Sequence, residues 1–183
     1  KASLELIRST LRPKGVAFIS YNAYPGWHMR GAVRGMAAMH AARFADPKNK
    51  VAAARSLVEF LQSAVDKDSA YGRLLATEAS SLLQGRDDYV FHEHLEDHNQ
   101  PFYLLDFLKL AEAAELQFLG EANFSSMITL GLPQNIAQTL TQMAGGDPRL
   151  MEQYLDFVRN TYFRQTLLVP AAARPHRRIT PTR

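Results

Sequence analysis

The stretch GVAFISYNAYPGWHMR, residues 15–30, carries the strongest indication of the fold. Its first part is short, apolar and rich in β-branched and aromatic residues, which predicts a buried strand over 15–21. Pro25 and Gly26 then punctuate the chain, and a helical pattern follows. The turn between the two crowds together Tyr21, Asn22, Tyr24 and Trp27. A simple connection does not need such side chains, so this turn is a candidate functional region.

The composition is that of a folded globular protein. The chain has 183 residues, of which 46% are hydrophobic and 21% charged. Cysteine is absent, which excludes disulfides and thiolate chemistry and fits a reducing compartment. The sequence contains no apolar run near the ~20 residues of a membrane helix, and its charged N-terminus is unlike a signal peptide. We therefore expect a cytoplasmic protein without a membrane partner.

The basic character of the chain is concentrated at its end. The net charge is +3, but the final stretch contributes Arg174, Arg177, Arg178 and Arg183 without an acidic residue. The rest is close to neutral, so it has no broad phosphate-binding surface. We interpret residues 170–183 as a solvated, Pro/Arg-rich tail, and nucleic acid is not an expected partner. A nucleic-acid-binding tail is the alternative.

Hydrophobic periodicity predicts a mainly helical protein with a few short strands (α+β). Within the helix expected at 51–65, Val51, Ala54, Val58, Leu61 and Val65 form an apolar seam. The other expected helices cover 3–11, 27–45, 69–83, 100–115, 133–143 and 148–161; residues 86–100 form an ordered connection, and a second strand covers 116–121. The segment RQTLLVP, residues 164–170, is either the end of a helix or a third strand. These strands must pair with one another, with another chain or with a missing part of this one.

Four segments carry a resemblance to a known family. Residues 4–22, LELIRSTLRPKGVAFISYN, resemble the helix, Pro-Gly turn and fifth strand of class I S-adenosylmethionine-dependent methyltransferases. Residues 20–36, 91–127 and 152–169 resemble the predicted methyltransferase regulatory domain. That domain accompanies the catalytic fold of certain bacterial methyltransferases, some of them related to protein lysine methyltransferases.

The resemblance implies an organisation and a role. Residues 1–26 would be the late part of a methyltransferase fold, and residues 27–169 a helical regulatory domain packed on this remnant of the sheet. The implied function is regulation or substrate positioning for a catalytic domain, in cis or in trans, that holds S-adenosylmethionine. No G-x-G loop occurs in this sequence, so we expect neither cofactor binding nor catalysis by this chain alone. The alternative is a helical protein-interaction or dimerisation module, with the 51–65 seam as the contact.

The resemblance also suggests a substrate site. In α/β sheets ligands lie beyond the carboxyl ends of the strands, and aromatic rings attract cations such as amines. The side chains assigned to substrate binding on this basis are Tyr21, Asn22, Tyr24, Trp27, His92, Glu93 and Arg164. The alternative for the first four is a turn packed by aromatic rings. For Arg164, structural ion pairing is favoured over binding of a substrate carboxylate, and Asp156 is expected to pair with Arg159.

A metal site is not expected in HEHLEDH, residues 92–98. No single secondary structure places its three histidines on one face.

Overall fold

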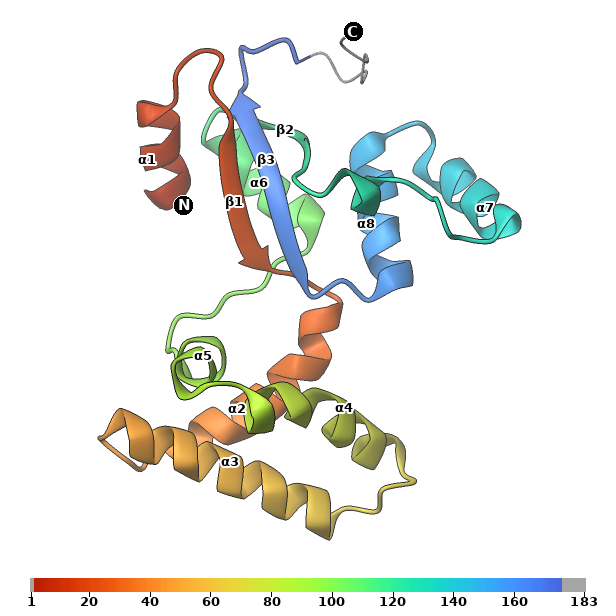
Figure 1. The fold of residues 1–183 in the computed structure, drawn as a ribbon. Helices are drawn as coiled ribbons and strands as arrows, with labels where there is room; N and C mark the ends of the chain where they lie inside the picture. The colour runs from red at the N-terminus through yellow and green to blue at the C-terminus, as the bar shows by residue number, and fades with distance from the viewer. Residues whose placement is uncertain (1, 176–183) are drawn as a thin grey trace, which may run out of the picture. The chain divides into compact units, whose positions relative to one another are not determined.

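The chain leaves its first strand, forms a group of helices, and then returns to complete the sheet (Figure 1). The computed structural model describes residues 2–175, so residues 176–183 of the predicted basic tail lie outside the described part. Two compact units result: Lys1–Pro25 together with Pro101–Arg183, and Gly26–Gln100. The structure therefore differs from the predicted division into 1–26 and 27–169. Residues after 100 belong with the first unit because they supply the partners of the first strand.

Three antiparallel strands form the sheet of the first unit, in the order β1-β3-β2. They are β1 (Ala17–Asn22), β2 (Leu116–Glu121) and β3 (Phe163–Pro170). The segment left open as helix or strand is therefore strand β3, and it pairs with both others. The predicted fold class, mainly helical with a few short strands, is confirmed.

One face of this sheet is covered by helices α1 (Ala2–Thr10) and α6 (Leu104–Ala113). Figure 1 shows α6 behind the strands and α1 beside β1. The shared core is apolar and contains Leu4, Ala17, Leu104, Phe107, Leu108, Ala111, Leu116, Phe118 and Leu168. The turn from α1 into β1 is tight, because a Cβ atom at Gly15 would lie 2.7 Å from Leu11 Cδ1. The predicted helix, turn and strand are thus held by one apolar layer.

The opposite face of the sheet is open. Directly opposed residues of antiparallel strands share a face, which places Phe18 beside Leu167 and Asn22 beside Phe163. Phe18 is 56% exposed and Phe163 is 44% exposed. Among the described residues no helix is packed over these two rings. We call Phe18, Phe163 and Leu167 the open face.

The outer edge of β1 is also open. The Ala23 N–H donates to Tyr162 O on β3's side, whereas Asn22 O accepts from Phe102 N–H on the other side. Because these directions alternate along a strand, the backbone groups of Phe18 and Ser20 point away from β3. Apart from the single bridge between Ala23 and Phe102, no described strand pairs with this edge.

Helices α7 (Gln134–Ala144) and α8 (Pro148–Arg159) stand between β2 and β3 in the chain, after a short 3-10 helix, Phe124–Met127. The boundaries follow local rules. Gly145 ends α7 in a left-handed conformation with φ 56°. Asp147 caps α8 by accepting the N–H of Arg149 at 2.8 Å, and Pro148 occupies the first turn.

The second unit contains α2 (Gly26–Ala41), α3 (Pro47–Ala64), α4 (Ala70–Gln84), α5 (Asp87–Val90) and a π-helix, Phe91–Leu95. Asp46 and Ser69 cap α3 and α4 through their side chains. The connection predicted over 86–100 contains α5 and the π-helix, so it is more helical than expected. Within residues 2–175 there is no helix with the length and apolarity that crossing a membrane requires.

The apolar seam of α3 faces the interior of its own unit. Val51, Ala54 and Val58 are at most 2% exposed and pack with residues of α2 and α4, including Val33, Leu75 and Leu82. The seam is therefore not a free dimerisation surface. A charge introduced at Val58 would be buried in this core and would unfold the unit rather than dissociate a dimer.

A buried histidine lies in the second unit. His94 is 0% exposed, and its Nε2 atom lies 3.4 Å from Ser81 Oγ. Its Nδ1 atom has no hydrogen-bond partner within the described part of the chain. Burial, together with the charges of Arg30 and Arg34, lowers the pKa of His94 to about 4. The ring therefore stays neutral in the folded protein.

We predict that His94 makes this unit acid-labile. The unfolded chain takes up a proton at His94 below pH 6.5, and the folded unit does so only near pH 4. Stability is therefore lost as pH falls between these values, by about 2 kcal/mol between pH 7 and pH 5. Urea unfolding followed by the fluorescence of Trp27 measures this stability. Between pH 7 and pH 5, His94→Gln should lose less of its free energy of unfolding than the unmodified chain. His92→Gln, at an exposed position, is the control, and equal pH slopes for all three chains would contradict the prediction.

Candidate functional site

The turn after β1 divides its side chains between the core and the surface. The ring of Tyr21 stacks on Phe107 with centroids 4.0 Å apart, and its hydroxyl lies 3.1 Å from Thr166 Oγ1. Burial raises the pKa of Tyr21 well above its usual value. Asn22 and Tyr24, at the end of the strand, exchange backbone hydrogen bonds with Phe102. Tyr21 is thus part of the packing, whereas Tyr24 lies where the strand ends.

Tyr24 begins a row of aromatic rings from three elements. Its ring centroid lies 5.2 Å from that of Tyr103, the N-cap residue of α6. Tyr103 meets Phe157 of α8 edge-on at 6.1 Å, and Phe157 lies 6.2 Å from Tyr154. We call Tyr24, Tyr103, Tyr154 and Phe157 the aromatic row. Phe157 is 48% exposed, so the row has a solvent-facing side.

A buried ionic cluster joins β2, β3 and α8. Arg164 of β3 donates to Asp156 Oδ2 at 2.5 Å, to Glu152 Oε2 at 2.8 Å and to Glu121 Oε1 at 3.1 Å. We call these four residues the Arg164 cluster; all are at most 8% exposed. Three carboxyl groups thus share a single guanidinium. The carboxylates occupy Arg164, which agrees with the favoured expectation of structural ion pairing.

The cluster is extended by neutral partners. The Thr166 hydroxyl donates to Glu121 Oε1 at 2.7 Å, and the Gln165 N–H donates to Glu121 Oε2 at 2.9 Å. Because Thr166 also contacts the Tyr21 hydroxyl, a polar network connects β1 to β2 across β3. Both carboxylate oxygens of Glu121 accept hydrogen bonds, as a buried carboxylate requires.

Burial dominates the acid–base properties of the cluster. It raises the pKa of Glu152 to about 7, although Arg164 opposes the change. It also raises the pKa of Asp156. The neighbouring carboxylates favour the charged form of Arg164 and raise its pKa despite burial. Glu152 therefore holds a proton at neutral pH part of the time, which reduces the excess negative charge.

The other predicted site residues have partners in the second unit. Trp27 is 3% exposed, and the guanidinium of Arg30 lies 5.4 Å from its ring centroid. Glu93 lies 4.0 Å from Arg30 Nη1. The side chain of His92 is 80% exposed and lies 3.5 Å from Glu96. Trp27 and Glu93 thus share Arg30, whereas Tyr21, Asn22, Tyr24 and Arg164 belong to the first unit.

The structure corrects one ion pair expected from the sequence and adds two aromatic neighbours of Tyr24. Asp156 does not pair with Arg159: it binds Arg164, and Arg159 donates to the carbonyl oxygens of Ser126 and Ile128. Sequence analysis also missed Tyr103 and Phe157 as neighbours of Tyr24. The only available signal was aromatic residues at the ends of predicted helices, which does not specify a meeting point.

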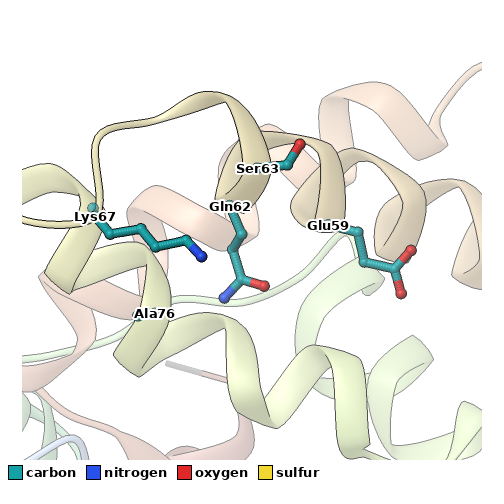
Figure 2. A pocket seen from close by; sticks show the side chains of 6 residues that line it. Glu59, Gln62, Ser63, Lys67 and Ala76 are labelled. Carbon is teal, nitrogen blue, oxygen red and sulfur yellow. The ribbon is translucent and has the colours of Figure 1, made fainter.

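A groove between α3 and α4 carries no comparable set of groups. It is lined by Glu59, Gln62, Ser63, Lys67, Gly72 and Ala76 (Figure 2). Its charged residues, Glu59 and Lys67, are exposed. Among residues 2–175 there is also no group of three or more His, Asp or Glu side chains arranged to hold a metal ion.

Comparison with known proteins agrees with the resemblance found in the sequence. Residues 86–170 match the model of the predicted methyltransferase regulatory domain. The resemblance to this family is thus confirmed for that part of the chain.

The chain is also similar to several proteins that are longer than it is. PKMT2 from Rickettsia typhi, solved in complex with AdoHcy, matches with a TM-score of 0.81 and 33% identity over 97% of this chain. The uncharacterized protein RP789 of Rickettsia prowazekii is 36% identical over 86% of it, and RP028 of the same organism is 32% identical over 63%. The chain spans 34% of PKMT2, 28% of RP789 and 47% of RP028.

We predict that removing the guanidinium of the cluster destabilises the first unit. Arg164→Leu leaves three carboxyl groups buried without a cation, which typically costs about 3–5 kcal/mol. The exposed Arg149, which pairs with Asp147 and Glu112, provides the control, and Arg149→Leu should cost less than about 1 kcal/mol. The loss of stability in each variant can be measured by hydrogen exchange of the β3 amides. Similar small losses for both variants would contradict the structural role of Arg164.

Glu152 should make the same unit less stable at high pH. Because its pKa rises from 4.5 to about 7 on folding, its favourable contribution is complete below pH 4.5 and is lost as pH rises through 7. Glu152→Gln keeps an uncharged side chain, so at pH 8 it should be more stable than the unmodified chain by on the order of 2 kcal/mol. The difference should disappear near pH 4.5. A variant less stable at pH 8 would show that Glu152 is needed as a charge.

Proposed function

We propose that this chain is the regulatory and substrate-positioning part of an S-adenosylmethionine-dependent methyltransferase. The observation that carries the proposal is the incomplete sheet: β1 has an open outer edge, and the open face exposes Phe18 and Phe163. The family match and the length of PKMT2 support it, because the matched part is only 34% of that protein. The rest of the methyltransferase would occupy these surfaces.

In this proposal the sheet of the first unit continues the catalytic sheet. A further strand would pair with the outward backbone groups of Phe18 and Ser20, since unpaired strand edges readily accept another strand. Helices of the catalytic part would cover the open face. The surface beyond Asn22 and Tyr24 would then lie at the edge of the sheet where ligands of α/β proteins bind.

The chemical contribution of this chain would be alignment and exclusion of water. S-adenosylmethionine supplies an activated methyl group, and its transfer depends on in-line placement of the acceptor more than on a strong acid or base. The cofactor would be held by the part of the longer protein that this chain does not span. A homodimer stays an untested prediction, and the buried seam of α3 does not support it.

A chimaera tests the proposal. This chain would replace the matched third of PKMT2, and AdoHcy binding would be measured by calorimetry. We expect the chimaera to bind AdoHcy and Phe18→Glu to abolish or strongly weaken binding, because the charge would face the docked catalytic part. Phe60→Glu, at a similarly exposed aromatic residue of α3, is the control.

Two results would contradict the proposal. One is a Phe18→Glu chimaera that binds AdoHcy as well as the Phe60→Glu chimaera. The other is micromolar binding of S-adenosylmethionine by this chain alone, since the proposal places the cofactor elsewhere. Circular dichroism of the separate chain with Phe18→Glu should remain unchanged, because Phe18 is 56% exposed.

A further inference from the structure

The aromatic row has features that simple packing does not require. Tyr24, Tyr103 and Phe157 come from the turn after β1, the N-cap of α6 and the last turn of α8. Their rings meet at 5.2 and 6.1 Å in tilted and edge-on geometry. Phe157 is 48% exposed, so the row presents an aromatic surface to solvent rather than a closed core.

The Arg164 cluster, which shares helix α8 with Phe157, carries a net negative charge. Asp156 precedes Phe157 in α8, and Glu152 lies one turn earlier. Together with Glu121 they place three carboxyl groups around the single guanidinium of Arg164. An aromatic face attracts cations through its quadrupole, and the net negative charge of the nearby Arg164 cluster, which shares α8 with Phe157, adds to the same preference.

The position of the row relates it to the methyl acceptor. Tyr24 lies two residues after the last residue of β1, at the end of the strand where the proposed catalytic sheet would expose its ligands. We propose that Tyr24, Tyr103 and Phe157 hold the positively charged nitrogen group of the methyl acceptor's side chain as the acceptor binds. The nitrogen that attacks must then give its proton to water, because methyl transfer from S-adenosylmethionine needs a lone pair on that nitrogen. The assignment rests on the proposed function for its biological meaning. It differs from the set expected from sequence. Trp27 is buried, the ring of Tyr21 is stacked on Phe107, and Tyr103 and Phe157 take their place.

The recognition step can be measured on this chain without the catalytic part. The probes are Nα-acetyl-lysine amide, Nα-acetyl-arginine amide and the neutral isostere Nα-acetyl-norleucine amide. Their titration would be followed through the ring signals of Tyr24, Tyr103 and Phe157 by NMR. We expect the two cations to shift these signals with millimolar affinity and norleucine amide to bind more weakly. The lysine and arginine compounds distinguish an ammonium from a guanidinium acceptor.

Matched variants assign the binding to the row. Phe157→Leu should weaken binding of the cationic probe about two- to fivefold, as expected for a partly exposed cation–π contact. Tyr24→Leu should act in the same direction. Phe60→Leu, at a 62% exposed ring on α3, should leave the affinity unchanged. Circular dichroism confirms that each variant is folded.

The outcomes separate this proposal from the preceding one. Equal binding of the neutral and cationic probes, or the absence of ring shifts at 100 mM probe, would overturn the assignment of a cation site. Neither result affects the chimaera experiment, which measures assembly of the sheet. Conversely, a chimaera that fails to bind AdoHcy would leave cation binding by the row intact but without its assigned role.

Discussion

The arrangement of the first unit depends on the ion pairs of Arg164. This side chain comes from the central strand, and its carboxylate partners come from β2 and α8. Without them, α8 would keep its contacts with α6, such as the hydrogen bond from Leu105 N–H to Gln153, but would lose its ion pairs to the strands. The guanidinium fork can serve several carboxylates at once, which a lysine ammonium does with less geometric definition. Buried charges are tolerated here because each of the three carboxyl groups accepts a hydrogen bond from Arg164.

The aromatic row is a consequence of this attachment. Phe157 lies on α8 beside Asp156, so the ion pair that fixes Asp156 also fixes where Phe157 meets Tyr103. Gln153 of the same helix accepts the N–H of Leu105, in the first turn of α6. The packing residues and the candidate binding residues therefore alternate along one helix. A change in the buried cluster would be transmitted to the exposed surface through α8.

The sheet gives the clearest link between architecture and the proposed role. The three-stranded sheet leaves backbone groups of β1 without a strand partner at its outer edge. It also leaves apolar side chains exposed on its open face. Aromatic side chains such as Phe18 and Phe163 on the open face cost free energy in water, and an open strand edge risks unwanted pairing. Both features are explained if a larger methyltransferase sheet continues from β1, as the length of PKMT2 suggests.

The sequence by itself determined the local elements and the family. The apolar run before Tyr21 specified β1, and the pairs Asp46-Pro47 and Asp147-Pro148 specified two helix starts, because caps and strand patterns act over a few residues. Tertiary structure decided what these elements do together. It placed Arg164 in a buried ionic cluster and stacked the half-buried Tyr21 on Phe107, and it brought Tyr103 and Phe157 to Tyr24. Such contacts depend on strand register and on helix packing between segments that are distant in the sequence. Short-range sequence patterns contain no information about either.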